Sequence, residues 1–282
     1  EKKKVSSKII NIQKINSLPL SIKKKLLKDL KKITKKRDLL KDKNHMLMGV
    51  LNLTPDSFSD GGKFNSLTKA NERVKTMIDS GADIIDVGGE STRPGSKIVS
   101  QKNELRRVKK VIKKFKSKYP KTLLSVDTRK SLVMNFSIKH NADIINDVSC
   151  FTFDPNSLNT LKNQNLWKII HHMQGTPQTM QINPKYNNVI LDIYDFFEQQ
   201  IEKLKKLKYH KKIILDPGIG FGKNLKHNLM ILNKISIFHS LGFPILIGTS
   251  RKKFINQISG NYDTKERIGG TLSSITFSFS HG

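Results

Sequence analysis

Short apolar runs that end abruptly in polar residues recur along this chain of 282 residues. Each run is rich in Val, Ile and Leu and is too short for an independent helix, which is typical of strands covered on both faces of a parallel sheet. Seven runs follow this pattern, at residues 46–62, 82–94, 123–130, 142–149, 167–175, 212–223 and 244–252.

The segments between these runs have the character of helices. They span residues 68–80, 102–118, 131–140, 187–207 and 227–241. Strands that alternate with helices indicate parallel βα units, and an α/β barrel takes about 250 residues as one domain. We therefore predict an α/β barrel over residues 45–282. Residues 1–44 are rich in Lys, and we predict that they form a helical extension with a basic amphipathic helix within 21–40.

Polar residues stand where the apolar runs stop. They are Asn52, Asp86, Glu90, Asp127, Asn146, His172, Asp216 and Ser250. In parallel α/β sheets, ligands bind at the carboxyl ends of the strands. The repetition therefore predicts one shared ligand site at this end of the sheet.

Composition limits the class of protein. No apolar run reaches the ~18 residues of a membrane span, and the amino end lacks a secretory signal, so we expect a soluble cytoplasmic protein. The single Cys150 excludes an intramolecular disulfide and a multi-cysteine zinc site. The net charge of this chain is +29, and a large positive charge is common in proteins that bind nucleic acids or membranes. The charge comes mostly from Lys on predicted helix surfaces, so we interpret it as solvated and predict no nucleic-acid or membrane partner.

Several longer motifs resemble one enzyme family. They are LNLTPDSFSDGG, DVGGESTRPG, SVDTRK, INDVS, HHMQGTPQTMQ, LDPGIGFGKN and GTSRKKFI, in this order over residues 46–282. On these motifs the chain is identified as a member of the dihydropteroate synthase family, the folate-pathway enzymes inhibited by sulfonamides. The resemblance implies a TIM (β/α)8 barrel that joins p-aminobenzoate to 6-hydroxymethyl-7,8-dihydropterin pyrophosphate. It also implies release of pyrophosphate with Mg²⁺ present, and a homodimer.

The pterin site can be considered from its chemistry. A pterin edge presents an amino group and ring N–H donors, so its receptor needs buried carboxylates and amides. Asp127, Asn146 and Asp216 supply this set, and in the family the matching positions hold the pterin. The resemblance places Lys252 on the oxygen and nitrogen side of the ring. An isolated Asp before Pro-Gly, as at Asp216, is otherwise an ordinary turn residue.

Departure of pyrophosphate requires anion binding and charge neutralisation. The resemblance assigns Asn52 to Mg²⁺ held together with the pyrophosphate, although one amide oxygen is a weak ligand for a hard cation. It assigns Thr92 to the phosphates. It places Arg93 in a mobile loop that closes over the substrate.

Two further loops complete the expected site. The resemblance assigns the polar loop 54–64 to shielding of a pterin cation, with Asp56, Phe58 and Asp60 as its catalytic residues. Exclusion of water would protect such a cation from hydrolysis. The resemblance also places Ser250 and Arg251 at the carboxylate of p-aminobenzoate. We interpret His171 and His172 as pocket lining rather than as metal ligands.

The carboxyl end departs from the family pattern. The family's eighth strand carries an Arg-x-His pair and is followed by a last helix, and the match stops at Gly282 before both. We therefore expect a barrel truncated before its eighth strand and helix, and a weakened dimer.

Two other functional hypotheses remain. One is the methyltetrahydrofolate domain of corrinoid methyltransferases, which shares the Asp, Asn and Asp set but lacks the TPDSFSDGG loop and the SRK lysine. The other is a non-catalytic basic barrel that binds nucleic acid, for which salt-dependent retention on DNA is the diagnostic.

Overall fold

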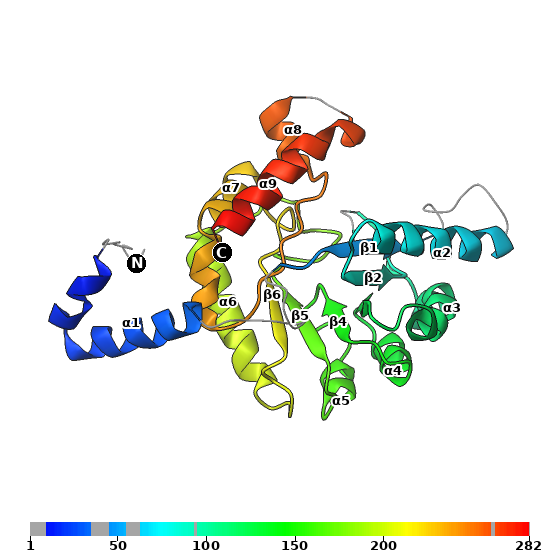
Figure 1. Ribbon diagram of the computed structural model, residues 1–282, viewed down its shortest axis with the longest axis horizontal. Helices are drawn as coiled ribbons and strands as arrows, with labels where there is room; N and C mark the ends of the chain where they lie inside the picture. The colour runs from blue at the N-terminus through cyan, green and yellow to red at the C-terminus, as the bar shows by residue number, and fades with distance from the viewer. Residues whose placement is uncertain (1–9, 35–44, 55–62, 93–94, 261–262, 282) are drawn as a thin grey trace.

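Six parallel strands form one sheet in chain order (Figure 1). The computed structural model describes residues 10–34, 45–54, 63–92, 95–260 and 263–281, and for residues 63–66 the backbone alone. The strands are β1 (Met48–Asn52), β2 (Ile84–Gly88), β3 (Leu123–Asp127), β4 (Ile144–Asp147), β5 (Trp167–His171) and β6 (Ile213–Asp216). They coincide with the first six predicted runs. Their carboxyl ends all meet at one end of the sheet.

Helices follow the strands and cover the outer face of the sheet (Figure 1). They are α2 (Lys63–Asp79), α3 (Gln101–Lys118), α4 (Ser131–Lys139), α5 (Ser157–Leu161), α6 (Val189–Leu204), α7 (Leu225–Asn233), α8 (Lys253–Ser259) and α9 (Ile268–Ser280). Side chains cap the amino ends of α3, α6 and α7, where Ser100, Asn188 and Asn224 accept hydrogen bonds from backbone N–H groups. These caps fix where each strand-end loop stops.

Two apolar clusters hold the barrel together. The larger lies between the sheet and the helices and includes the fully buried rings of Phe115, Phe197 and Phe238. The smaller lies on the other face, with Ile84, Ile144, Ile169 and Ile214 at its centre. Successive strand side chains point to opposite faces, so one strand contributes to both clusters.

The predicted seventh strand at 244–252 is wrong as a full strand. It makes one parallel bridge, between Ile245 and Leu215 of β6. Two backbone hydrogen bonds hold it: Leu215 N–H donates to Pro244 O at 2.9 Å, and Leu246 N–H donates to Leu215 O at 2.8 Å. No strand in the described ranges pairs with the outer side of β1. At this side of the barrel, Phe279 of α9 contacts the ring of His45, with 4.4 Å between centroids.

The Lys-rich segment contributes η1 (Ile12–Ser17) and α1 (Leu20–Ile33). In Figure 1, α1 extends from the barrel as the blue helix and meets it beside α6. The helix packs on η3 (Ile235–Leu241), and the stem of Lys32 lies beside Gly242. The helix predicted within 21–40 is thus present at least to Ile33, while the division into an extension and a barrel domain stays a prediction. Among described helices, none is both long and apolar enough to span a bilayer.

Candidate active site

A polar layer lies on the inner face of the sheet, directly above the smaller apolar cluster. Two residues after each inner isoleucine, β2, β4, β5 and β6 carry Asp86, Asn146, His171 and Asp216. The two-residue period places these polar side chains on the same face as the isoleucines. The parallel register brings Asn52, Gly88, Asp127 and Asn146 side by side across β1 to β4, and His171 beside Asp216 across β5 and β6. The strand-end site predicted from the apolar runs is therefore a single layer.

Asp86 and Asn146 form the buried centre of this layer. Asn146 Nδ2 donates to Asp86 Oδ2 at 3.1 Å. Their other oxygens, Asp86 Oδ1 and Asn146 Oδ1, are buried and have no hydrogen-bond partner in the described part of the chain. Burial raises the pKa of Asp86, and the neighbouring Ser125 hydroxyl and the Asn146 amide oppose that rise. Because buried polar groups in proteins are almost always satisfied, two orphaned acceptors indicate a ligand that brings donors.

Asp127 faces the same space from β3. Burial raises the pKa of Asp127 well above its ordinary value, and the negative charges of Asp86 and Glu104 add to the rise. Gly88 leaves room between Asp127 and β1, since a Cβ on Gly88 would lie 3.4 Å from Asn52 Oδ1 and 3.5 Å from Asp127 Oδ2. A ligand that donates hydrogen bonds to the Asp127 carboxyl group would therefore stabilise this buried side chain.

Asp216 at the end of β6 uses its two oxygens differently. Oδ1 accepts a hydrogen bond of 2.7 Å from Gly218 N–H, which closes the turn predicted from the Asp-Pro-Gly sequence. Oδ2 lies 3.8 Å from His171 Nε2, beyond hydrogen-bond range. Burial lowers the pKa of His171 to about 4 despite the charge of Asp216, so the imidazole is neutral at pH 7. Asp216 thus combines a turn role with one carboxylate oxygen directed to the layer.

Lys252 reaches this layer from the loop before α8. Its ammonium donates to Ile219 O and lies 4.8 Å from the centre of the Phe221 ring. The same ring makes an edge contact with His171 at 4.5 Å. Burial lowers the pKa of Lys252 to about 8, and the charge of Asp216 opposes the shift. Phe221 therefore offers an apolar face between a cation and a neutral imidazole.

A second buried lysine lies behind the β6 loop. Lys223 Nζ donates to Phe221 O at 2.9 Å and lies 3.0 Å from His172 Nδ1. Burial lowers the pKa of Lys223 well below its usual value. The His172 ring contacts Phe196 of α6 edge-on, at 4.9 Å. Of the two histidines expected to line the pocket, His171 belongs to the inner layer, and His172 faces α6.

The loop after β2 carries Thr92, which is half-buried. Its neighbours fix its course: Ser96 Oγ donates to Ser91 O at 2.6 Å, and Gly95 N–H donates to Pro177 O at 3.2 Å. Gln178 Nε2 donates to Ser96 O at 2.9 Å. The loop therefore rests on the loop after β5.

The remaining predicted residues separate into two groups. Ser250 and Arg251 are exposed. Arg251 has a φ of +52°, and its backbone is tied to Thr271 of α9 and to Arg267. The other group, Asp56, Phe58, Asp60 and Arg93, lies outside the described residues.

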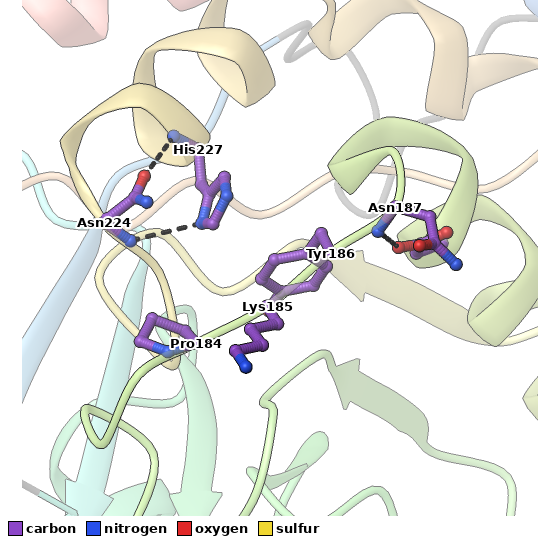
Figure 2. A pocket seen from close by; sticks show the side chains of 7 residues that line it. Pro184, Lys185, Tyr186, Asn187, Asn224 and His227 are labelled. Atoms are coloured by element: carbon purple, nitrogen blue, oxygen red, sulfur yellow. Dashed lines mark hydrogen bonds between the residues drawn. The ribbon is translucent and has the colours of Figure 1, made fainter. Parts of the chain in front are cut away.

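A surface pocket of about 460 Å³ lies beside the layer rather than within it. Figure 2 shows Asn224 and His227 at the start of α7 facing Tyr186 and Lys185 from the loop before α6. Tyr186 Oη donates to Gly222 O at 2.8 Å, so the pocket wall is joined to the β6 loop. None of the predicted site residues lines this pocket.

The described residues contain no group of three His, Cys, Asp or Glu side chains that could hold a metal ion. Asn52 Oδ1 and Asp127 Oδ2 nevertheless flank the bare Gly88 and are hard oxygen donors. Mg²⁺ commonly binds one or two protein oxygens together with substrate phosphates and water. The donors present fit an ion that arrives with a phosphate ligand.

Several site residues escaped the sequence prediction. Asp86 belongs to the strand-end residues predicted to share a ligand site, but the sequence assigns it no separate role, and its two-residue spacing from Ile84 is the available signal. Phe221 and Lys223 lie within the LDPGIGFGKN motif, but no local sequence pattern distinguishes them from their neighbours in the motif. Their roles in the layer depend on the fold of the β6 loop.

Comparison with known proteins agrees with this geometry. A family model described as "Pterin binding enzyme" matches residues 48–282. The chain is 44% identical over 228 residues to the dihydropteroate synthase of Escherichia coli K12, covering 80% of each chain. A Yersinia pestis dihydropteroate synthase with a sulfonamide drug complex superposes with a TM-score of 0.78 at 39% identity, covering 84% of this chain and 85% of that one. The enzyme from Xanthomonas albilineans in complex with 7,8-dihydropteroate gives 0.74 at 30% identity, covering 84% of both chains.

The barrel and its inner polar layer thus define a pterin-binding α/β-barrel enzyme. Within that class, the chain belongs to the dihydropteroate synthase family.

Proposed function

We infer that the chain joins 6-hydroxymethyl-7,8-dihydropterin pyrophosphate to p-aminobenzoate in folate biosynthesis, giving 7,8-dihydropteroate and pyrophosphate. The orphaned buried acceptors of Asp86 and Asn146 carry this inference, because a pterin edge supplies an amino group and a ring N–H that match them. Complexes of family members with 7,8-dihydropteroate and with a sulfonamide drug support it.

The layer supports the following roles for individual residues. Asp127 and Asp216 accept hydrogen bonds from the pterin edge, Asn146 accepts through Oδ1, and Lys252 donates to the oxygen side of the ring. The arylamine nitrogen of p-aminobenzoate attacks the exocyclic CH₂ of the pterin. The C–O bond to pyrophosphate breaks, and the nitrogen loses one proton. Ser250 and Arg251, on the exposed side of the same loop as Lys252, receive the carboxylate of p-aminobenzoate.

The pyrophosphate end lies towards β1 and the loop after β2. Thr92 binds phosphate oxygens there. Asn52 Oδ1, with Asp127 Oδ2 across Gly88, would hold a Mg²⁺ ion that enters with the substrate. When bound, this ion neutralises charge on the departing pyrophosphate.

The test is pyrophosphate release with both substrates, followed by chromatographic identification of dihydropteroate. The expected result is release that requires p-aminobenzoate, requires added Mg²⁺ and is inhibited by a sulfonamide. Release without p-aminobenzoate, or none with active substrate stocks, would refute the assignment.

We also propose that the chain forms a cytoplasmic homodimer. An apolar groove of about 510 Å³ between α7, α8 and α9 supports a subunit contact. Ile258 and Leu272, beside this groove, are each 60% exposed. Sedimentation at micromolar concentration distinguishes a dimer from a monomer.

A further inference from the structure

Four buried charged side chains form a cluster next to the substrate layer. Glu90, Glu104, Arg129 and Lys130 are 6%, 0%, 5% and 2% exposed. Two are acidic and two are basic, so the charges balance. None of the four is assigned to a substrate above.

Glu90 is the centre of this cluster. Its Oε2 accepts hydrogen bonds from Arg129 Nε at 3.1 Å and Nη2 at 2.7 Å. Its Oε1 lies 2.9 Å from Lys130 Nζ and accepts a hydrogen bond of 2.7 Å from Val99 N–H. Burial opposes ionisation of Glu90, but these three groups outweigh it and hold the pKa of the carboxyl below its ordinary value. The carboxylate is therefore charged and fully engaged at pH 7.

The contacts of Glu90 close the loop that carries Thr92. The loop starts at Glu90, and the Glu90 side chain holds Val99, nine residues later. The remaining cluster members fix this closed loop to its surroundings. Lys130 also donates to Glu104 in the first turn of α3, and Arg129 lies 4.2 Å from the ring centre of Phe153.

The same contacts tie the loop to the end of β3. Arg129 and Lys130 follow Asp127 by two and three residues, so the backbone leaving β3 is held by the Glu90 carboxylate. The packing of α3 against this point is tight. Arg107 donates to Gly89 O at 2.7 Å, and a Cβ on Gly89 would lie 3.1 Å from the carbonyl oxygen of Glu104.

We propose that Glu90 is a positioning residue that sets the distance between the Thr92 loop and Asp127. This inference rests on the proposed function, in which Thr92 binds the pyrophosphate and Asp127 the pterin. A buried ion cluster is a poor source of stability compared with apolar packing. Its distinguishing property is the directional geometry of charge-assisted hydrogen bonds, which here engage both oxygens of Glu90. The two halves of one extended substrate require such a fixed separation.

The test compares two ligands that differ only in the pyrophosphate. Calorimetry measures the Kd of 6-hydroxymethylpterin pyrophosphate and the Kd of 6-hydroxymethylpterin, both with Mg²⁺ present, for the wild type and for Glu90→Gln. We expect Glu90→Gln to weaken binding of the pyrophosphate ligand by roughly 30-fold, the equivalent of one charged hydrogen bond. Binding of 6-hydroxymethylpterin should change by less than about threefold, because the pterin layer keeps its own contacts.

Asp143→Asn is the matched control. Asp143 Oδ2 also accepts from a backbone N–H, that of Leu124 at 2.7 Å, and pairs with Lys116 at 2.5 Å. It lies before β4, at the opposite end of the strands from the substrate layer. This variant should leave both Kd values unchanged.

Glu90→Asp tests the same geometry without removing the charge. Its shorter side chain should give a smaller loss for the pyrophosphate ligand and the same selectivity between the two ligands. If circular dichroism shows that Glu90→Gln does not fold, the Glu90→Asp variant is used to test the proposal instead. Equal losses for the two ligands, or no loss in a folded variant, would overturn the positioning role alone. A wild-type chain that binds neither ligand would overturn the proposed function as well.

Discussion

Replacing Asp216 by Asn separates the two roles of this carboxylate. Oδ1 closes the turn through Gly218 N–H at 2.7 Å, and Oδ2 faces the layer. An Asn side chain retains an acceptor for Gly218 and places an NH₂ group where Oδ2 was. A pterin donor then loses a charge-assisted hydrogen bond, worth about 1.5–3 kcal/mol, and faces another donor at a cost of about 1–3 kcal/mol. The sum predicts at least a ~70-fold increase in the Kd for 6-hydroxymethylpterin.

Stability should respond differently from binding in this series. Asp216→Asn should keep the free energy of unfolding within about 0.5 kcal/mol, whereas Asp216→Ala should lose about 0.5–1.5 kcal/mol with the Gly218 hydrogen bond. Calorimetry measures the Kd values, and urea denaturation measures the free energies. A folded Asp216→Asn variant that binds the pterin within threefold of wild type would refute the binding role. The carboxylate would then be a turn residue alone.

Three further predictions concern Lys252, Gly218 and Cys150. Burial lowers the pKa of Lys252 to about 8, so the ammonium loses its charge as the pH rises through this value, and affinity for the pyrophosphate substrate should fall. When KM is measured over a series of pH values, the Lys252→Arg variant should show no such fall in affinity. A fall at the same pH in this variant would contradict the prediction. In Gly218→Ala, at a φ of +69°, the added Cβ would lie 2.0 Å from His172 O, so urea denaturation should show a loss of more than about 3 kcal/mol. Gly81→Ala, at +97° in open space, should lose only about 1–2 kcal/mol, and equal losses would argue against the steric cause. Burial raises the pKa of the Cys150 thiol, so a chromogenic disulfide reagent should label the native chain roughly 100-fold more slowly than the unfolded chain, and rapid native labelling would show an accessible thiol.

The sequence was sufficient for most of the fold because its apolar runs report burial directly. Six runs became strands with neighbours in the sheet. The run at 244–252 has the same composition but pairs with β6 through one bridge. A run forms a hydrogen-bonded strand only when a neighbouring strand pairs with it, so its composition alone could not distinguish the run at 244–252 from the other six.

The site was less predictable, since it depends on orientation and on distant partners. Adjacent residues such as His171 and His172 point to opposite faces, and a shift of one residue exchanges them. The pairing of Glu90 with Lys130 joins positions 40 residues apart and leaves no local pattern. The roles that the family resemblance gave to Asp127 and Lys252 stay predictions, although both side chains reach the layer.

The two-residue offset between Ile84 and Asp86, and between Ile214 and Asp216, divides each strand into a section for folding and a section for recognition. Mutational tolerance along a strand should therefore change within one step of about 7 Å. The lower section should accept other apolar residues of similar volume and reject polar ones. The upper section should accept changes that preserve folding while they alter which ligand is bound. Such a division lets a lineage change the ligand that it binds without rebuilding the barrel.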